Sequence, residues 1–312
     1  MTMNKKRFLS SLLVLFLGVI QLGYAATINV AGISYSYWFN TPTNRNEAFV
    51  TVPGSGIYYV GDIVIPTTFT LGNENECTVI GIDKGAFYNC TGLTSVTIPE
   101  GATTIKEGAF SGCSKLTSVN IPSTITIIEK QAFYRCSKLT SVAIPAGVSI
   151  IGDDTFLECN ALTLISLPDG LTSIGESAFL RCTGLTEISI PSSVKSIGSA
   201  AFQGCSGLTD VYCYATDVPQ TERSTFNAQD INNTILHVPS SAVDAYKNTA
   251  PWSNFKEILA ITEEPDRIIL PQSGKLASNG FYTIDGKKAD KLSRGVNVII
   301  NKDGVPKKVI VK

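Results

Sequence analysis

Apolar and polar positions repeat along this chain with a period of 23 residues. Four residue types return at that interval through six consecutive units, with no insertion between them. A fixed period of this length is typical of a solenoid, in which one unit cannot bury its apolar face until its neighbours stack on it. The four columns are Phe87, Phe110, Phe133, Phe156, Phe179 and Phe202; Cys90, Cys113, Cys136, Cys159, Cys182 and Cys205; Leu93, Leu116, Leu139, Leu162, Leu185 and Leu208; and Ile82, Ile105, Ile128, Ile151, Ile174 and Ile197.

Each unit predicts one short strand followed by a turn. In residues 93–99, apolar and polar side chains alternate from Ser95 onward, which is the period of a strand. Pro99 ends the strand because proline has no N–H for the ladder, and Ile105 re-enters the core. We expect residues 106–113, with the pattern Ala-Phe-x-x-Cys, to form a single helical or 3₁₀ turn. Equivalent strands should pair in parallel about 4.8 Å apart.

Both ends of the repeat are atypical, as the caps of a solenoid should be. The run 63–66 matches the strand pattern but is followed by an insertion, and the run 236–239 matches it again two periods plus two residues after Pro191. We therefore expect about eight stacked strands. The predicted division is an N-terminal β cap at 26–78, repeats at 79–213, and a C-terminal cap with a degenerate repeat at 214–262.

The unit resembles the BspA-like subgroup of leucine-rich repeats. Residues 171–185, which read Leu-Thr-Ser-Ile-Gly-Glu-Ser-Ala-Phe-Leu-Arg-Cys-Thr-Gly-Leu, carry this resemblance, and the ending with Tyr246, Trp252 and Phe255 is similar to the terminal caps of that group. The resemblance implies a leucine-rich-repeat solenoid, with a parallel sheet on one face and short helical or 3₁₀ turns and irregular segments on the other. It also implies a bacterial surface protein involved in adhesion and in host or matrix interaction.

The eight cysteines are candidates for metal binding or disulfide formation. Six of them recur every 23 residues, which predicts a line along the solenoid, whereas a metal site needs clustered ligands. We expect buried thiols that pack as small hydrophobic side chains. They would fill a role analogous to the asparagine that general leucine-rich repeats have and this chain lacks. The alternative is oxidation of neighbouring rungs after export, which a spacing of about 5 Å permits.

Residues 1–25 have the pattern of a secretory signal peptide. Lys5-Lys6-Arg7 is the charged region, residues 12–20 are apolar, and Gly23-Tyr24-Ala25 offers a cleavage site before Ala26. The apolar run is too short to span a bilayer, so we expect no transmembrane segment after cleavage. The chain is therefore expected to be exported, through the periplasm, to the cell surface or the extracellular space.

The end of the chain predicts a small antiparallel β module at 269–312, after a linker at 263–268. Asp285-Gly286 between two β-rich runs is a hairpin signal. The module is similar to the C-terminal sorting tails of type IX secretion, which implies delivery to the outer surface. The alternative is a basic module that packs on the solenoid or on a partner. The matching runs are Phe281–Lys288, Gly295–Ile300 and Val305–Lys312.

Charge is distributed unevenly, although the formal net charge is −1. Residues 269–312 carry nine Lys or Arg and three Asp, and residues 1–25 carry three basic side chains and no acid. The body between them is therefore close to −10 (−1 − 6 − 3). An acidic body argues against nucleic acid and other polyanions as ligands.

Common catalytic signatures do not occur in the chain. The motifs G-x-S-x-G, H-E-x-x-H and G-x-x-x-x-G-K-[ST] are missing. His237, the only histidine, falls in a cap strand and is expected to be a pendant strand residue. Asp153-Asp154 lies at a turn whose helical N-terminus would favour acids, and Glu263-Glu264 is a solvated pair in the linker. We expect no enzymatic activity, no metal and no cofactor.

The outer face of the strands remains as the candidate functional surface. Its two outward columns are small and polar over most of their length, and become apolar, acidic and aromatic toward the C-terminal end. We expect this end to bind a protein or glycan ligand outside the cell. The alternatives are a merely solvated face, or a structural surface protein that associates with itself. The candidate residues are Leu164, Glu187, Asp210, Tyr212 and Tyr214.

Overall fold

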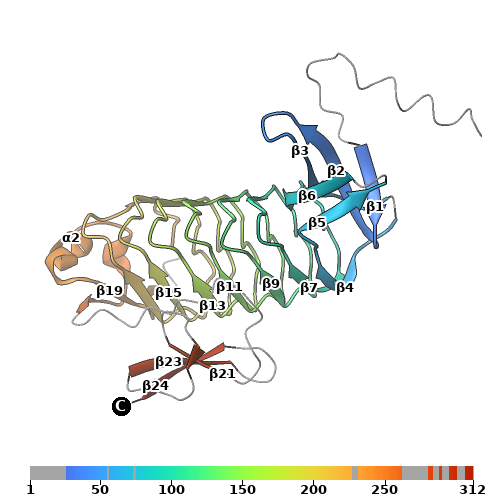
Figure 1. Ribbon diagram of the computed structural model, residues 1–312. Coiled ribbons are helices and arrows are strands. Elements are labelled where there is room, and N and C mark those ends of the chain that lie inside the picture. The colour runs from blue at the N-terminus through green and yellow to red at the C-terminus, as the bar shows by residue number, and fades with distance from the viewer. Residues whose placement is uncertain are drawn as a thin grey trace, which may run out of the picture.

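The computed structural model describes residues 26–261, apart from 55, 73–74 and 227–230, and the backbone of four strands between 280 and 311. Over 26–261 the chain forms a coil of stacked rungs with a cap at each end (Figure 1). The predicted signal peptide, the linker at 263–268 and the pair Glu263-Glu264 lie outside the described residues.

One wall of the coil consists of the strands that the repeat predicts (Figure 1). They follow in chain order along the wall and pair in parallel within three groups, from β4 to β9, from β11 to β13 and from β15 to β20. Ser95, for example, lies opposite Ser118, and Ser141 lies opposite Leu164. The eight expected strands are confirmed, and a ninth, β20, pairs in parallel with β19. The strands are β4 (Val60–Val64), β7 (Gly92–Thr97), β9 (Ser118–Asn120), β11 (Ser141–Ala143), β13 (Leu164–Ser166), β15 (Glu187–Ile190), β17 (Asp210–Cys213), β19 (Ile235–Pro239) and β20 (Glu257–Ile261).

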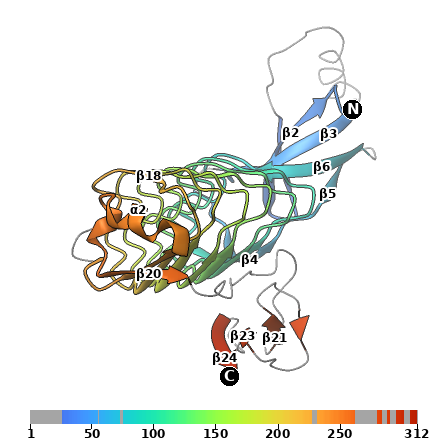
Figure 2. The same ribbon diagram turned by 90° about the vertical axis from the view of Figure 1, so that its left-hand side faces the viewer.

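The opposite wall is a second series of parallel strands, at the position where each repeat re-enters the core, and it pairs in two groups, from β6 (Asn75–Ile82) to β10 and from β12 to β18. Figure 2 shows β18 and β20 on opposite sides of the coil. In these two-residue strands the first side chain points outward and the second inward, so that Ile127 is 50% exposed while Ile128 is buried. The strands are β8 (Thr104–Ile105), β10 (Ile127–Ile128), β12 (Ile150–Ile151), β14 (Ser173–Ile174), β16 (Ser196–Ile197) and β18 (Gln220–Thr221).

The segment between the two walls is neither the helical turn nor the 3₁₀ turn that we expected. Residues 106–113 contain hydrogen bonds of the i to i+3 type, such as Ser111 N to Gly108 O at 3.0 Å, but Gly108 and Gly112 have φ angles of +61° and +77°. Because of these left-handed residues, every second N–H of the segment points toward the next rung instead of along the segment. Gly112 N, for example, donates to Tyr134 O of the next rung at 2.8 Å. The turns therefore form a third ladder between rungs instead of a helix.

A stack of phenylalanine rings runs through the core from one cap to the other. Successive ring centroids are 4.9 to 5.5 Å apart, and their planes differ by at most 11°. Tyr59 extends the stack at the N-terminal end, and Phe226 continues it into the edges of Trp252 and Phe255. Each aromatic side chain buries roughly 150–250 Å², so the stack is a large part of the apolar burial. The stacked rings are Phe87, Phe110, Phe133, Phe156, Phe179, Phe202 and Phe226.

The cysteines form the expected column of buried thiols beside this stack. From the second repeat to the sixth, each thiol donates to the carbonyl of the phenylalanine one rung earlier, as Cys136 Sγ does to Phe110 O at 3.2 Å. The thiols therefore connect rungs in the way expected of a column that replaces asparagine. Burial raises the pKa of Cys77 and of Cys213 to about 11, and raises that of Cys136 well above its ordinary value.

The N-terminal cap is a mixed sheet that continues directly into the short-strand wall. Its first three strands pair antiparallel, the third then pairs in parallel with β6, and β6 pairs in parallel with β8. β6 therefore belongs both to the cap and to the first rung. The cap strands are β1 (Ala26–Val30), β2 (Ile33–Asn40), β3 (Arg45–Val50), β5 (Thr68–Leu71) and β6 (Asn75–Ile82).

The C-terminal cap covers the last rung with three buried aromatic side chains, Tyr246, Trp252 and Phe255, as the sequence predicts. Trp252 and Tyr246 are fully buried, with their ring centroids 5.3 Å apart. Trp252 Nε1 donates to Pro219 O at 3.3 Å, and Tyr246 Oη donates to Ala215 O at 3.0 Å, so both polar ends are satisfied. The cap comprises η1 (Ser240–Ala242), α2 (Val243–Lys247) and η2 (Trp252–Asn254) (Figure 1).

The C-terminal strands pair with one another as a four-stranded antiparallel sheet, in agreement with the expected β module. They are β21 (Gly280–Thr283), β22 (Lys288–Ala289), β23 (Gly295–Ile300) and β24 (Pro306–Val311). Among the described residues, no helix has the length and apolar character needed to cross a membrane.

The phenylalanine stack predicts a large loss of stability on truncation at its centre. We expect Phe133→Ala to lower the free energy of unfolding by about 3–5 kcal/mol, because a fully buried ring is lost between two stacked neighbours. Tyr88→Ala, at a side chain 56% exposed, is the matched control and should cost about 1 kcal/mol or less. Chemical unfolding followed by circular dichroism measures both, and equal losses would contradict the importance of the stack.

The buried thiols predict a sharp contrast in alkylation. Iodoacetamide reacts with the thiolate form of cysteine. Because burial raises the pKa of these thiols, little thiolate is present at pH 8 in the folded protein. We expect iodoacetamide to leave the folded protein unmodified and to label all eight cysteines once guanidinium unfolds it. Mass spectrometry counts the labels, with a reduced sample as the control. Fewer labels in the unreduced than in the reduced unfolded sample would show disulfides between rungs.

Candidate binding surfaces

The residues expected to bind a ligand lie on the outer face of the long wall, toward its C-terminal end. β15 and β17 pair in parallel, with Glu187 opposite Asp210 and Ser189 opposite Tyr212. β13 lies beside β15, and the register places Leu164 in the same outward column as Glu187 and Asp210. Four of the five candidates therefore share one surface.

His237 in β19 joins this surface and connects two of its residues. The register of β17 and β19 places His237 opposite Tyr212, and the two rings stack with centroids 4.3 Å apart and planes 12° apart. His237 Nε2 lies 2.8 Å from Asp210 Oδ1, and Thr209 Oγ1 donates to Asp210 Oδ2 at 2.9 Å. The placement of His237 in a strand is as expected, but its side chain is held by two neighbours. We call Asp210, Tyr212 and His237 the β17–β19 cluster.

The signal for His237 was present in the repeat. The run 236–239 matches the strand pattern, and this alignment alone puts His237 in the outward column of Tyr212. The two extra residues before it left the register between the strands open. The structure places those residues in the connection between β17 and β19, so the pairing of the strands is not shifted.

The chemistry of the cluster suits recognition of a polar ligand. Burial raises the pKa of Tyr212, and the negative charges of Asp210 and Glu187 raise it further. The phenol therefore stays protonated into the alkaline range and can donate as well as accept a hydrogen bond. Beside it, Asp210 supplies a carboxylate that is about one-third exposed. A donor, a charged acceptor and an aromatic edge thus meet on two adjacent strands.

Tyr214 does not extend the cluster through its polar group. Its hydroxyl oxygen is buried, and its backbone N–H donates to Ile190 O at 3.0 Å. Leu164 and Glu187 remain half-buried, with their outer surface available to a ligand. The structure thus separates Tyr214 from the other four candidates.

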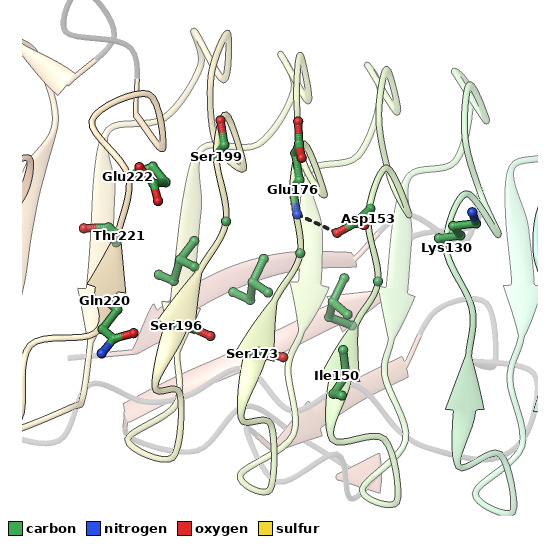
Figure 3. Close-up of a pocket in the computed structure, with 16 residues that line it drawn as sticks. Lys130, Ile150, Asp153, Ser173, Glu176, Ser196, Ser199, Gln220, Thr221 and Glu222 are labelled. Atoms are coloured by element: carbon green, nitrogen blue, oxygen red, sulfur yellow. Dashed lines mark hydrogen bonds between the residues drawn. The ribbon is translucent and has the colours of Figure 1, made fainter.

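An open groove of about 780 Å³ lies on the short-strand wall, where the sequence indicated no site (Figure 3). Three glycines from successive rungs line it. A Cβ atom at Gly175 would lie 2.7 Å from Asp153 N, and one at Gly198 would lie 2.6 Å from Glu176 N, so only glycine allows the rungs to approach here. The sequence signal for the groove was this glycine column, which is Gly152, Gly175 and Gly198.

The rims of this groove differ in character. Figure 3 shows uncharged side chains along one rim and mostly charged ones along the other. Asp153 Oδ1 accepts a hydrogen bond from Glu176 N at 2.8 Å, so this carboxylate serves the turn backbone. No cysteine or histidine lines the groove. The uncharged rim has Ile150, Ser173, Ser196 and Gln220, and the other has Lys130, Asp153, Glu176, Ser199 and Glu222.

Metal ligation has no evident basis in the described part of the chain. No three His, Cys, Asp or Glu side chains there are grouped so that they could hold a metal ion. The cysteine column donates to backbone carbonyls, and Asp153 and Asp154 do not converge on a common point with further acids.

The repeat region matches a known protein family. Residues 80–209 and 126–249 match the model described as a BspA type leucine-rich repeat region, in six copies, and together span more than half of the chain. A comparison with curated protein sequences gives no match.

Solved structures share the solenoid. A leucine-rich repeat protein of T. pallidum is 24% identical with a TM-score of 0.52, over 72% of this chain and 94% of that one. A leucine-rich cell surface protein of Faecalibacterium prausnitzii A2-165 is 18% identical with a TM-score of 0.46, over 78% and 96%. A leucine-rich repeat protein of Bacteroides capillosus ATCC 29799 is 27% identical with a TM-score of 0.38, over 45% and 96%. The first of these shows a common fold.

The β17–β19 cluster predicts energetic coupling between Asp210 and His237. In a double-mutant cycle with Asp210→Asn and His237→Gln, we expect a coupling free energy of about 0.5–1 kcal/mol, since the pair is partly exposed. Chemical unfolding of the four proteins measures it. Asp210→Asn combined with Thr97→Ala, several rungs away in the same wall, should be additive. Additivity in both cycles would mean that Asp210 and His237 do not interact in the folded protein.

Proposed function

The chain belongs to the BspA-type leucine-rich repeat family, and from this premise we propose that it is an exported surface protein that recognises a ligand. The ligand is a protein or a glycan outside the cell, and the binding surface is the β17–β19 cluster with Glu187 and Leu164 beside it. Recognition here is non-catalytic. Export is supported by the signal-peptide pattern of residues 1–25.

The observation that carries this proposal is a change of character along the outward columns of the long wall. Over most rungs these columns hold serine, threonine, asparagine or alanine, which meet the needs of the fold with small groups. Only in the last rungs do a carboxylate, a phenol and an imidazole contact one another. Polar groups held in place by neighbours are ordered before a ligand arrives, which reduces the entropy lost on binding.

The test is a binding screen with matched variants. The protein from Ala26 onward would be applied to a glycan array and to immobilised extracellular-matrix proteins. We expect a saturable ligand whose affinity falls about tenfold or more in Asp210→Asn/Tyr212→Phe. The control, Ser95→Ala/Thr97→Ala, changes the same two columns at the N-terminal end and should bind as the wild type does. Equal affinity of both variants for the ligand would show that the cluster is not part of the binding surface.

A structural, self-associating role is the second candidate, and the edge strand β4 favours it. Val60 and Val64 are 65% and 69% exposed, and among the described residues β4 pairs with β7 alone. An exposed apolar edge is a common site of association between chains. This role would be favoured over recognition if the protein bound neither the glycan array nor the immobilised matrix proteins, and if the folded protein sedimented as oligomers.

A further inference from the structure

A second groove, of about 530 Å³, runs along the turns that connect the two walls. Its apolar part is a column of side chains at the 23-residue spacing, Tyr134, Leu157 and Leu180. Both leucines are only partly buried, whereas the leucines of the repeat column, from Leu93 to Leu208, are buried in the core. Gln203 and Gly204 continue the lining toward the C-terminal end. We call this feature the turn-edge groove.

A row of alternating charges borders the turn-edge groove. Arg135 Nε donates to Glu158 Oε2 at 2.8 Å, and Arg181 Nη1 donates to Glu158 Oε1 at 3.2 Å. The two arginine side chains are 57% and 66% exposed, whereas that of Glu158 is 24% exposed. Three successive rungs thus present two guanidinium groups to solvent, with one carboxylate buried further between them.

These three charged residues occupy backbone positions that suit glycine better. Arg135, Glu158 and Arg181 have φ angles of +58°, +58° and +60°, in the left-handed region. At the equivalent position of the flanking rungs the chain has Gly112 and Gly204. A side chain in this conformation costs roughly 1 kcal/mol relative to glycine. The fold therefore does not require long charged side chains here, and their presence calls for another reason.

We propose that the turn-edge groove is a second interaction surface, which binds a short acidic segment of a partner protein. An aliphatic or aromatic side chain of the segment packs against Leu157 and Leu180, and a neighbouring carboxylate is held by Arg181 and Arg135. A guanidinium has five N–H donors, so one bond to Glu158 leaves donors for a further carboxylate.

Two observations favour a short peptide over an acidic polysaccharide. Leucine side chains complement apolar amino-acid side chains, while sugars bury mostly hydroxyl groups. The body of the protein is close to −10 (−1 − 6 − 3) outside its terminal segments, so a long polyanion would be repelled once it extended beyond the two arginines. A segment with one or two acids avoids this repulsion. The proposal is independent of the β17–β19 cluster, which lies on the long wall.

The experiment measures fluorescence anisotropy of labelled decapeptides with the protein from Ala26 onward. The peptides carry one glutamate between leucine, isoleucine or phenylalanine residues, and matched peptides carry glutamine or lysine in place of the glutamate. A labelled tetragalacturonate provides the sugar arm. The test variant is Arg135→Gln/Arg181→Gln. The control is Lys115→Gln/Lys138→Gln, which removes two positive charges from exposed positions outside the groove. Circular dichroism confirms that each variant is folded.

We expect glutamate peptides to bind the wild type, and to bind the arginine variant at least about tenfold more weakly. The lysine control should stay within about twofold of the wild type, and higher salt should weaken binding. Leu180→Ala, which keeps both arginines, should also weaken binding. Asp210→Asn should leave it unchanged, which separates this surface from the β17–β19 cluster.

Four results would overturn the proposal. One is that no glutamate peptide binds the folded wild type with a dissociation constant below about 1 mM. Another is equal binding of the glutamate and glutamine peptides, which would show that the carboxylate of the peptide does not contribute to binding. A third is an equal loss in the arginine variant and the lysine control, which would reduce the effect to overall charge. Binding of the tetragalacturonate alone would replace the protein partner by an acidic sugar.

Discussion

Backbone hydrogen bonds between successive rungs are the constraint on which the rest of this structure depends. Two strand ladders and one turn ladder hold each rung one strand spacing from the next, about 4.8 Å. A side chain that repeats every 23 residues therefore meets its own copy. Phenylalanine fits this constraint because its rings stack at 4.9 to 5.5 Å, and cysteine fits because its thiol reaches the carbonyl of the preceding rung.

The same constraint aligns equivalent outward residues of successive rungs into columns. New surface chemistry therefore arises where the residue type in a column changes from one rung to the next. Uniform small polar columns satisfy the fold and present little chemistry. The β17–β19 cluster and the row of Arg135, Glu158 and Arg181 along the turn-edge groove are both departures from such uniformity. In each, side chains from adjacent rungs contact one another across the rung spacing. A solenoid can thus carry several independent surfaces, because each needs only two or three neighbouring rungs.

Several features of the fold follow from the sequence alone, because a period repeated six times leaves no freedom in the register. The strands of the long wall, the phenylalanine stack, the buried cysteine column and the aromatic C-terminal cap were all predictable from residue spacing. The candidate residues Glu187, Asp210 and Tyr212 could be placed on one outer face for the same reason. The short-strand wall was visible only as an isoleucine that re-enters the core.

The tertiary structure decided the features that depend on the sign of a dihedral angle, on an insertion or on clearance between rungs. The turns are ladders and not helices because two positions in each turn adopt positive φ, as Gly108 and Gly112 do in one rung and Gln131 and Arg135 do in the next. The spacing of residues does not report the sign of φ. His237 meets Asp210 because the two extra residues before it are placed outside the paired strands. Composition and period determine which side chains repeat, whereas the contacts between unlike side chains depend on three-dimensional positions that no repeat encodes.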